Sequence, residues 1–361
     1  MVGDALFEKL KIWADENDID DLQYDHKFKS ERGIPRDKQK FLSLKTVNLS
    51  RSHLTQVPKE LFYLNLSTLR LSDNQIVQLP QAIGNLHNLQ EFNISNNAIS
   101  DIPKELFYLT NLKRLVLSVN QLVYLPHELE NLENLELLDL DYNQLRGLPE
   151  ELFNLKKLKK LSVWKNLLSE LSFGIGEFTE LEELNLRDNY IEKLPRHIGA
   201  LSNLIKFDMR NNKLTELPKD VAGLKNLQEL DLSNDLGSEN INQLKHLPSE
   251  IGKLANLDKL NLCNNKIMDL PREFGDLAKL TRLNLSNNSL EELPESFGKL
   301  ENLMDLDLGV NNLKTLPKEI INLKLLRLDL SQNPDLVLSN EQIEWVKTIQ
   351  IVHWSSEENL Q

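Results

Sequence analysis

Apolar and polar positions alternate along the chain in a phrase that returns at a fixed step. The phrase reads LxxLxLxxNxL, where x is mostly polar, and its asparagine advances by 23 residues from Asn74 to Asn97 and again to Asn120. The short alternating stretch in each copy, such as the one that begins at Leu112, predicts a strand with leucines on one face and polar side chains on the other. The Leu-Pro segment that follows favours a short helical or 3-10 turn, because proline has a preset φ and no N–H donor to leave unpaired.

The asparagine position of the phrase occurs thirteen times. It is occupied by Asn74, Asn97, Asn120, Asn143, Asn166, Asn189, Asn212, Asn265, Asn288, Asn311 and Asn333, and by Ser52 and Asp235. A column of prolines accompanies it and is interrupted only at Ser172. A buried asparagine amide can bond the backbone groups that are exposed where the chain leaves a strand. We therefore interpret this column as scaffold and not as a binding site.

Thirteen copies of one short unit predict a stacked array in which each copy contacts only its neighbours. Successive strands are expected to lie in parallel about 4.8 Å apart. Because the turns are wider than the strands, the array should bend into a horseshoe with its sheet on the concave face and its turns on the convex face. We predict an α/β solenoid with an N-terminal helical cap at 1–43, repeats at 44–334, and a C-terminal cap helix and tail at 335–361.

The N-terminal cap is expected to contain a helix within residues 1–20. Leu6, Leu10 and Trp13 have the i, i+4, i+7 spacing of one helical stripe, and Phe7 lies beside it. Such an apolar stripe could cover the leucines of the first repeat.

The C-terminal cap is expected to begin at a capping box formed by Ser339 and Gln342. The predicted helix offers Ile343, Trp345 and Val346 to cover the last repeat. The tail beyond Trp354 is expected to be frayed.

One repeat is longer than the others. From Asp235 to Asn265 the step is 30 residues, so that seven residues are extra. Insertions in such arrays form loops, sometimes beside a partner, but long surface loops cost little stability. We favour a tolerated insertion over a contact with a partner.

Charge and cysteine content restrict the class of protein. The net charge of −13 disfavours a phosphate backbone or an anionic membrane as partner. Cys263 is the only cysteine, which excludes internal disulfides. The first residues carry ionisable groups and no long apolar stretch, so a secretory signal and a membrane span are not expected. We predict a cytoplasmic, monomeric array, and export by a route without a signal is left open.

The phrase LPxEIGxLxNLxxLxLSxNxL is present almost verbatim at 247–267. It resembles the Ras-group intracellular leucine-rich repeat proteins of animals and plants, and it is similar to many bacterial repeat proteins of unknown role. The resemblance covers residues 44–333. It implies adaptor or scaffold proteins whose concave surfaces bind other proteins, some of which regulate small GTPases or phosphatases. No segment outside the repeats is long enough for a ligase or kinase domain.

The side chains expected on the concave sheet are those six, four, two and one positions before the asparagine, which we call the −6, −4, −2 and −1 rows. Most repeats have serine in the −2 row, whereas four consecutive middle repeats have Asp141, Trp164, Arg187 and Arg210. Large aromatic, aliphatic and arginine side chains are typical of the centre of a protein interface. The predicted partner-binding residues are Arg114, Val119, Leu137, Asp139, Asp141, Tyr142, Lys160, Trp164, Lys165, Arg187, Lys206, Asp208 and Arg210.

Packing within the sheet is the alternative for some of these residues. Trp164 could lie over Arg187 in a cation–π contact. The −6 row alternates in sign through Lys160, Glu183, Lys206 and Glu229, which favours stabilisation of the sheet over binding. The four rows together contain eleven basic and twelve acidic residues, so the concave face is expected to be nearly neutral.

Catalysis is not predicted. Asp139 and Asp141 are two residues apart on one strand face and are interpreted as a solvated acidic pair. Cys263 is expected to be exposed, without a histidine to activate it. The seven histidines lack metal-ligand spacing, and no glycine-rich phosphate loop is present, so no cofactor or metal is expected.

The sequence thus predicts a non-catalytic protein–protein interaction module whose partner docks on the concave face of the central repeats. The alternative is recognition of a carbohydrate or small ligand by Trp164 and Tyr142, with Asp139, Asp141 and Asn185 as polar neighbours.

Overall fold

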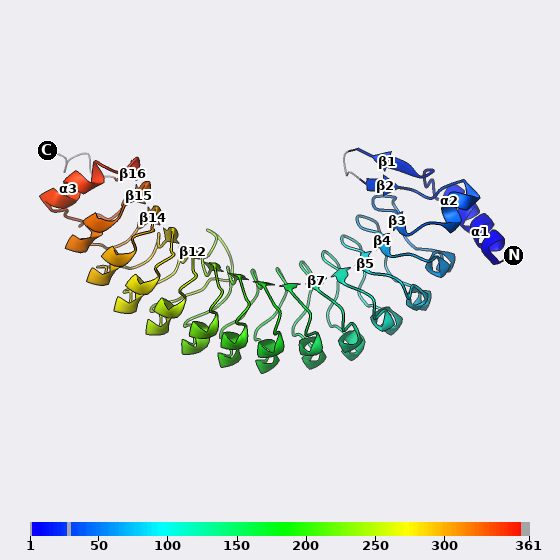
Figure 1. Cartoon of the computed structure of the whole chain (residues 1–361), viewed down its shortest axis with the longest axis horizontal. Helices are drawn as coiled ribbons and strands as arrows, with labels where there is room; N and C mark the ends of the chain where they lie inside the picture. The colour runs from blue at the N-terminus through cyan, green and yellow to red at the C-terminus, as the bar shows by residue number, and fades with distance from the viewer. Residues whose placement is uncertain (1, 27–29, 355–361) are drawn as a thin grey trace. The chain divides into compact units, whose positions relative to one another are not determined.

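The computed structural model describes residues 2–26 and 30–354. The chain divides into two compact units, Met1–Asn166 and Leu167–Gln361. Within each unit three-residue strands lie along the concave side and 3-10 turns lie along the convex side (Figure 1). This is the parallel-sheet solenoid that the repeat phrase predicts, with helices before the first repeat and after the last. The predicted domains, a cap at 1–43, a single array at 44–334 and a second cap at 335–361, have different boundaries from these two units. That division remains a proposal.

The first unit begins with the N-terminal cap. It contains helix α1 (Val2–Glu16), strands β1 (Gln23–Asp25) and β2 (Ser30–Arg32), which pair in antiparallel, and helix α2 (Lys38–Leu42). The repeats follow as the parallel strands β3 (Thr46–Asn48), β4 (Thr68–Arg70), β5 (Glu91–Asn93), β6 (Arg114–Val116), β7 (Leu137–Asp139) and β8 (Lys160–Ser162). Their turns are η1 (Lys59–Tyr63), η2 (Gln81–Asn85), η3 (Lys104–Tyr108), η4 (His127–Asn131) and η5 (Glu150–Asn154).

The second unit continues the same pattern. Its parallel strands are β9 (Glu183–Asn185), β10 (Lys206–Asp208), β11 (Glu229–Asp231), β12 (Lys259–Asn261), β13 (Arg282–Asn284), β14 (Asp305–Asp307), β15 (Arg327–Asp329) and β16 (Ile351–His353). Its turns are η6 (Phe173–Glu177), η7 (Arg196–Ala200), η8 (Lys219–Gly223), η9 (Ser249–Lys253), η10 (Arg272–Asp276), η11 (Glu295–Lys299) and η12 (Lys318–Asn322), and helix α3 (Asn340–Val346) precedes β16.

The core of each unit is formed by the leucine positions of the phrase. The middle residue of each repeat strand is buried while its neighbours face outward, as in β6 with Leu115 and β7 with Leu138. Most turns start directly after a proline in extended conformation. At η6 the proline is replaced by Ser172, whose side chain accepts a hydrogen bond from Gly174 N at 3.1 Å and so caps the turn instead.

The asparagine column forms the predicted ladder of backbone contacts. Nδ2 of Asn143 donates to Leu117 O at 3.1 Å and to Leu140 O at 2.9 Å, and Oδ1 accepts from Leu122 N at 3.0 Å. Leu117 and Leu122 belong to the preceding repeat, and Leu140 belongs to the repeat of Asn143 itself. The structural role predicted for these asparagines is confirmed.

The irregular repeat departs from the prediction, because Asp235 does not take the asparagine position. Asn242 takes it: Nδ2 donates to Met209 O at 2.9 Å and to Leu232 O at 3.1 Å, and Oδ1 accepts from Leu214 N at 3.0 Å. The 30-residue step therefore runs from Asn212 to Asn242, and the inserted residues are 235–241. Asp235 is exposed, because a carboxylate cannot donate the two hydrogen bonds that the position requires.

The apolar stripe of α1 also differs from the prediction. Phe7, Leu10 and Ala14 are its buried residues, whereas Leu6 and Trp13 are only half-buried. Phe7 contacts Phe41 of α2 edge to face, with ring centroids 5.2 Å apart, so the predicted stripe is rotated toward this second helix. Neither α2 nor the β1–β2 pair was predicted.

The C-terminal cap has the predicted capping box between Ser339 and Gln342. Trp345 and Val346 are buried, and Trp345 Nε1 donates to Leu323 O at 2.9 Å. Ile343 is only half-buried. The predicted frayed tail lies outside the described residues. Across the described ranges, none of the helices has the length and hydropathy of a membrane span.

Candidate functional site

The thirteen predicted partner-binding residues all lie in the four outward-facing rows, and none is fully buried. Nine belong to the first unit, and Arg187, Lys206, Asp208 and Arg210 belong to the second. We describe the two sets separately.

An aromatic cluster formed by Tyr142, Trp164 and Lys165 lies on the first unit. The rings of Tyr142 and Trp164 meet edge to face, with centroids 4.6 Å apart at 72°. Lys165 Nζ lies 5.1 Å from the centroid of the Tyr142 ring. Tyr142 nevertheless remains 37% exposed, and Val119 in the preceding repeat is 42% exposed. The repeat thus gathers large side chains on a surface that solvent still reaches.

The backbone of the −1 row is unfavourable for these side chains. Val119, Tyr142 and Lys165 have φ of 55°, 53° and 54°, in the left-handed region. Asparagine and aspartate tolerate this region, whereas a β-branched residue is costly there. The two preceding repeats have Asp73 and Asn96 at this position.

Asp139 and Asp141 form a row of polar contacts beneath the aromatic cluster. Asp141 Oδ1 accepts from Ser162 Oγ at 2.5 Å and from Trp164 N at 2.7 Å, while Asp139 Oδ2 accepts from Ser118 Oγ at 3.1 Å. Burial and, to a smaller extent, the charge of Asp139 raise the pKa of Asp141 to about 6. The prediction of a solvated acidic pair is therefore wrong for Asp141, which holds the backbone of the aromatic cluster.

The −6 row of the first unit places Leu137 between two cations. Arg114 and Lys160 are its partners in the neighbouring strands β6 and β8. Both cations are exposed and Leu137 is half-buried. Leu137 is thus an apolar side chain between two basic groups in the −6 row, in the same repeat as Tyr142.

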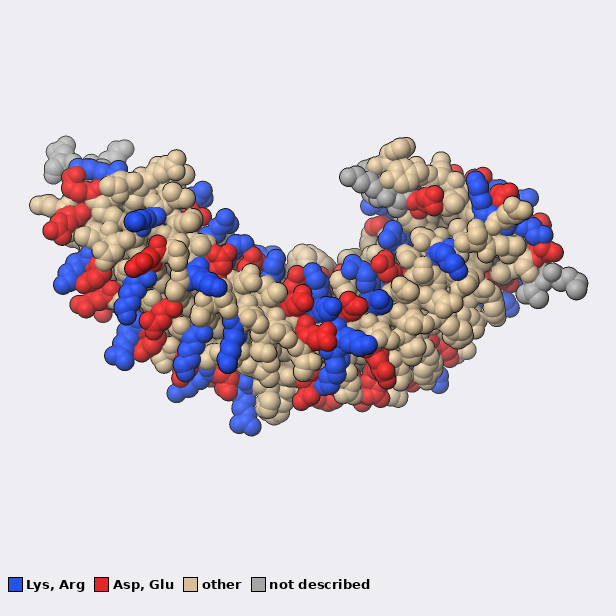
Figure 2. All heavy atoms as spheres, in the orientation of Figure 1, with Lys and Arg blue, Asp and Glu red and all other residues tan. Residues whose placement is uncertain are grey.

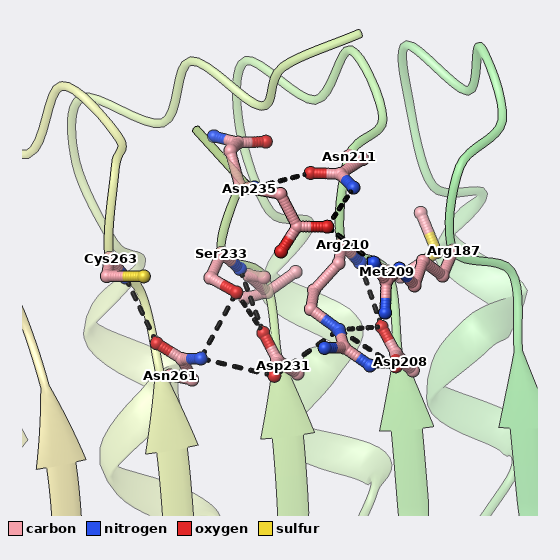
Figure 3. Close-up of polar contacts among 12 residues, drawn as sticks. Arg187, Asp208, Met209, Arg210, Asn211, Asp231, Ser233, Asp235, Asn261 and Cys263 are labelled. Carbon is pink, nitrogen blue, oxygen red and sulfur yellow. Dashed lines mark hydrogen bonds and ion pairs between the residues drawn. The ribbon is translucent and has the colours of Figure 1, made fainter. Parts of the chain in front are cut away.

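The second unit contains a carboxylate–guanidinium network (Figure 3). Arg210 Nη2 donates to Asp208 Oδ2 at 2.6 Å, and Arg210 Nε lies 3.5 Å from Asp231 Oδ2. Asp231 also accepts from Ser233 Oγ at 2.5 Å. Burial is the largest cause that raises the pKa of Asp231, and the charge of Asp208 adds to it. Arg210 thus balances two carboxylates and is not a free cation.

Arg187 is held by the inserted loop of the same unit (Figure 3). Its Nη2 lies 2.5 Å from Asp235 Oδ2. Its Nε lies 3.1 Å from Asp188 Oδ2. Asp235 Oδ2 also accepts from Asn211 Nδ2 at 2.8 Å, and Asp235 N donates to Asn211 Oδ1 at 2.7 Å. The insertion is therefore fastened at its start, and it presents Leu236, which is 85% exposed.

The alternating charges of the −6 row are paired in the second unit. Glu229 contacts Lys206 at 3.6 Å and Lys259 at 2.5 Å. Asp305 contacts Arg282 at 3.5 Å and Arg327 at 4.0 Å. Lys206 and Glu229 form an ion pair across neighbouring strands, as their alternating charges predict.

A groove of 770 Å³ lies over the −6 and −4 rows of the second unit, from Glu183 to His353. Of the predicted site residues it contains only Lys206, Asp208 and Arg210. The sequence analysis did not predict this groove, because it relied on large side chains that replace serine in the −2 row. The groove is marked instead by a −4 row that consists only of Asp and Asn.

The described part of the chain offers little support for a catalytic site. Cys263 was predicted to be exposed, but it is half-buried. Burial raises the pKa of its thiol. No group of His, Cys, Asp and Glu among the described residues could hold a metal ion. Figure 2 shows basic and acidic side chains interspersed on both units, without a continuous field of one sign on the displayed face.

The comparisons with known proteins agree on the fold. Residues 39–166 and 235–350 match the family described as leucine-rich repeat region, and residues 179–236 match the family described as leucine rich repeat. The chain matches no curated protein.

Solved structures give the same result. A leucine-rich repeat protein from Leptospira interrogans is 34% identical, with 94% of this chain and 97% of that chain covered and a TM-score of 0.72. The plant peptide hormone receptor RGFR1, solved in complex with RGF2, is 26% identical over 88% of this chain and 60% of its own, with a TM-score of 0.57. An internalin from Listeria monocytogenes, 23% identical over 91% of both chains with a TM-score of 0.71, shares the fold.

One strand per repeat, a ladder of asparagine amides and a short turn define a repeat solenoid. The chain belongs to the leucine-rich repeat family. Proteins with this fold generally mediate protein–protein interaction and are typically non-catalytic.

Proposed function

We propose that this protein is a non-catalytic adaptor or scaffold that binds another protein on its concave strand faces. In the first unit the aromatic cluster is the anchor, and Val119, Leu137, Arg114 and Lys160 surround it. Aromatic anchors bury a large area at a small cost in side-chain entropy, which is why they dominate the energy of many interfaces.

The observation that carries the proposal is the combination of exposure and unfavourable backbone at Val119 and Tyr142. Asparagine would fit the left-handed conformation better, and packing does not require the larger side chains, because 42% of Val119 and 37% of Tyr142 remain exposed. Strained residues that persist on a surface favour a functional role.

The set in the second unit has a different part in the proposal. Arg187 and Arg210 are ion-paired, and so they act as fixed hydrogen-bonding groups, Arg210 in the groove and Arg187 beside the inserted loop. Lys206 and Asp208 complete this set.

The kind of partner follows from charge and from the relatives. A net charge of −13 disfavours nucleic acid and anionic membranes. RGFR1, which is solved with RGF2, supports a peptide or protein as partner. A monomeric array in the cytoplasm, and regulation of a small GTPase or phosphatase, stay predictions. No catalytic group is assigned, in keeping with the raised pKa of the Cys263 thiol.

Carbohydrate recognition is the second candidate, since the Tyr142 and Trp164 rings lie beside two carboxylates. Asp141 is the weaker part of this argument, because its Oδ1 already accepts two hydrogen bonds. A glycan array probed with the intact protein and with Trp164→Ala would separate the two candidates: glycan binding that depends on Trp164 favours the second.

The proposed function is tested by affinity capture from the source cells, followed by calorimetry with the captured protein. Trp164→Ala and Tyr142→Ala should each weaken binding by about 2 kcal/mol, roughly thirtyfold. Tyr108→Ala is the matched control, because Tyr108 is 51% exposed on the convex turn η3. Equal affinities for all three variants would contradict the aromatic cluster as the anchor.

A further inference from the structure

The groove of the second unit has a continuous polar floor that the first unit lacks. Its −4 row reads Asn185, Asp208, Asp231, Asn261, Asn284, Asp307 and Asp329. In the first unit the same row is mixed and includes Arg70, Val116 and Ser162. The groove therefore offers acids and amides along one line across seven parallel strands.

Most carboxylates in this groove have a lysine or arginine partner, and two do not. The basic group beside these two is His353, which lines the same groove and is in register with Asp329 on β16. Glu229 and Asp305 are each flanked by two cations, and Asp208 is paired with Arg210. Asp307 accepts from Gly309 N at 3.0 Å, and Asp329 accepts from Ser331 Oγ at 2.6 Å. Among the described residues, no lysine or arginine forms an ion pair with either carboxylate. The two are nearest neighbours, in register on β14 and β15.

The −2 row has glycine beside these two carboxylates, and a larger residue there would crowd their oxygen atoms. A Cβ atom at Gly309 would lie 3.1 Å from Asp329 Oδ1 and 3.3 Å from Asp307 Oδ1. The flanking repeats have Ser286 and Ser331 at this position. Next to Gly309, Val310 is 38% exposed and offers an apolar surface. Two carboxylates without a lysine or arginine partner, a glycine that places no side chain over them and an aliphatic neighbour suit the head and stem of a lysine or arginine side chain.

Amide donors in the same row are also available. Asn185 Oδ1 accepts from Arg187 N, and Asn284 Oδ1 accepts from Ser286 N and Oγ. The Nδ2 groups of Asn185 and Asn284 donate no hydrogen bond to any described residue. They could donate to the carbonyl oxygens of a bound chain.

We propose that this groove docks an extended peptide segment of the partner that carries lysine or arginine, with a cationic side chain between Asp307 and Asp329. Six strand steps of about 4.8 Å span about 29 Å, which corresponds to about nine residues of extended chain. An open groove of this length exceeds a small ligand, and the acidic row repels a phosphate backbone. The proposal names a partner chemistry for the proposed function, but it rests on the second unit alone.

The test uses the full chain and three labelled peptides of about nine residues, the length that spans the groove. The peptides alternate glycine with lysine, glutamine or glutamate, and binding is measured by fluorescence anisotropy near neutral pH. The lysine peptide should bind and the glutamate peptide should not. The double substitution Asp307→Asn, Asp329→Asn should weaken the lysine peptide by about tenfold, because two charge-assisted contacts are lost.

The matched control is the double substitution Asp269→Asn, Asp276→Asn, which makes the same change of net charge on exposed residues outside the groove. It should change the affinity less than about twofold. Equal losses in the two double variants would show attraction by net charge only and would overturn the proposal, as would a lysine peptide that does not bind. Trp164→Ala should leave the affinity for the peptide unchanged, because Trp164 lies on the first unit. Failure of the groove proposal can therefore be distinguished from failure of the proposed binding role of the aromatic cluster.

Discussion

Asn242 repeats the hydrogen bonding of Asn212 from the far end of a seven-residue insertion. Nδ2 of Asn212 donates to Leu186 O at 2.9 Å, and Nδ2 of Asn242 donates to the equivalent Met209 O at 2.9 Å. Asn242 Oδ1 in turn accepts from Leu214 N. The insertion therefore interrupts the sequence period but not the ladder.

Asn242→Ala should destabilise the second unit by about 2–3 kcal/mol, because Leu214 N loses its acceptor in a buried position. Asp235→Ala removes an exposed ion pair and should cost less than about 1 kcal/mol. Urea unfolding of both variants measures the difference. Equal midpoints would contradict the assignment of Asn242 to the asparagine ladder.

Deletion of residues 235–241 should leave a folded protein. The deletion joins Asn234 to Asn242, which reproduces the pair Asn211–Asn212 and restores the 23-residue step. We expect the free energy of unfolding to change by less than about 2 kcal/mol, since the exposed loop adds little burial. Circular dichroism and size-exclusion chromatography check this, and aggregation of the deletion variant would contradict it.

Val119→Asn should stabilise the first unit by about 1 kcal/mol, because asparagine tolerates the left-handed backbone that valine resists. Val123→Asn is the control: Val123 is comparably exposed, at 45%, but its φ is not positive. Thermal unfolding compares the two. A gain in both variants would point to surface polarity instead of backbone strain.

Asp141→Asn should remove a pH dependence of stability. The pKa of Asp141 is raised to about 6 from its usual 3.8, so the folded state favours the protonated carboxyl. That stability is fully present below about pH 4 and is lost as the pH rises through 6. At about 1.4 kcal/mol per pKa unit, the variant should exceed wild type by roughly 2–3 kcal/mol at pH 8 and by little at pH 4.

Asp73→Asn provides a control of opposite sign. The side-chain hydrogen bond from Asn96 is the largest of the contacts that lower the pKa of Asp73, so its contribution is present near neutral pH and is lost as the pH falls. Urea unfolding across the pH range should show the two variants diverging from wild type in opposite directions. Parallel curves would refute the role of Asp141 burial.

Gln342→Glu should separate two roles of one cap residue. Glutamate can still accept from Ser339 N, but it loses the donations from Nε2 to Leu316 O at 2.9 Å and to Pro317 O at 3.2 Å. We expect a cost of about 2–4 kcal/mol at neutral pH, and partial recovery near pH 5 where the carboxyl can donate. Glu341→Gln, on the exposed side of the same helix turn, should change the urea midpoint little.

The repeat phrase was sufficient to predict the strands, the turns and the ladder, because each copy solves the same packing problem with the same residues. It was not sufficient at Asp235, where counting in fixed steps assigned the wrong residue to the ladder. The rule that a ladder residue must both donate and accept excludes Asp235, and a step of 23 residues back from Asn265 selects Asn242.

The candidate site was predictable as a surface but not as a set of contacts. Rows of side chains follow from the period, and so the exposure of Val119 and Tyr142 could be foreseen. The burial of Asp141 depends on Ser162 and on the backbone of Trp164, one repeat further along, and no property of Asp141 itself indicates it. The sequence analysis did not identify the groove, because each of its Asp and Asn residues is common in this repeat. Only the uninterrupted row of them is distinctive.

Each ladder asparagine touches two repeats, which makes the second unit a chain of coupled segments. Asn265 contacts the carbonyl oxygens of Leu232 and Leu262, and Asn288 contacts those of Leu262 and Leu285. If one repeat unfolded alone, buried donors in the adjacent folded repeat would lose their acceptors. Unfolding of a single internal repeat therefore costs additional free energy at its boundaries with folded repeats. Melting should therefore spread from the ends by whole repeats, and the seven-residue insertion is no weak point, because Asn242 carries the coupling across it.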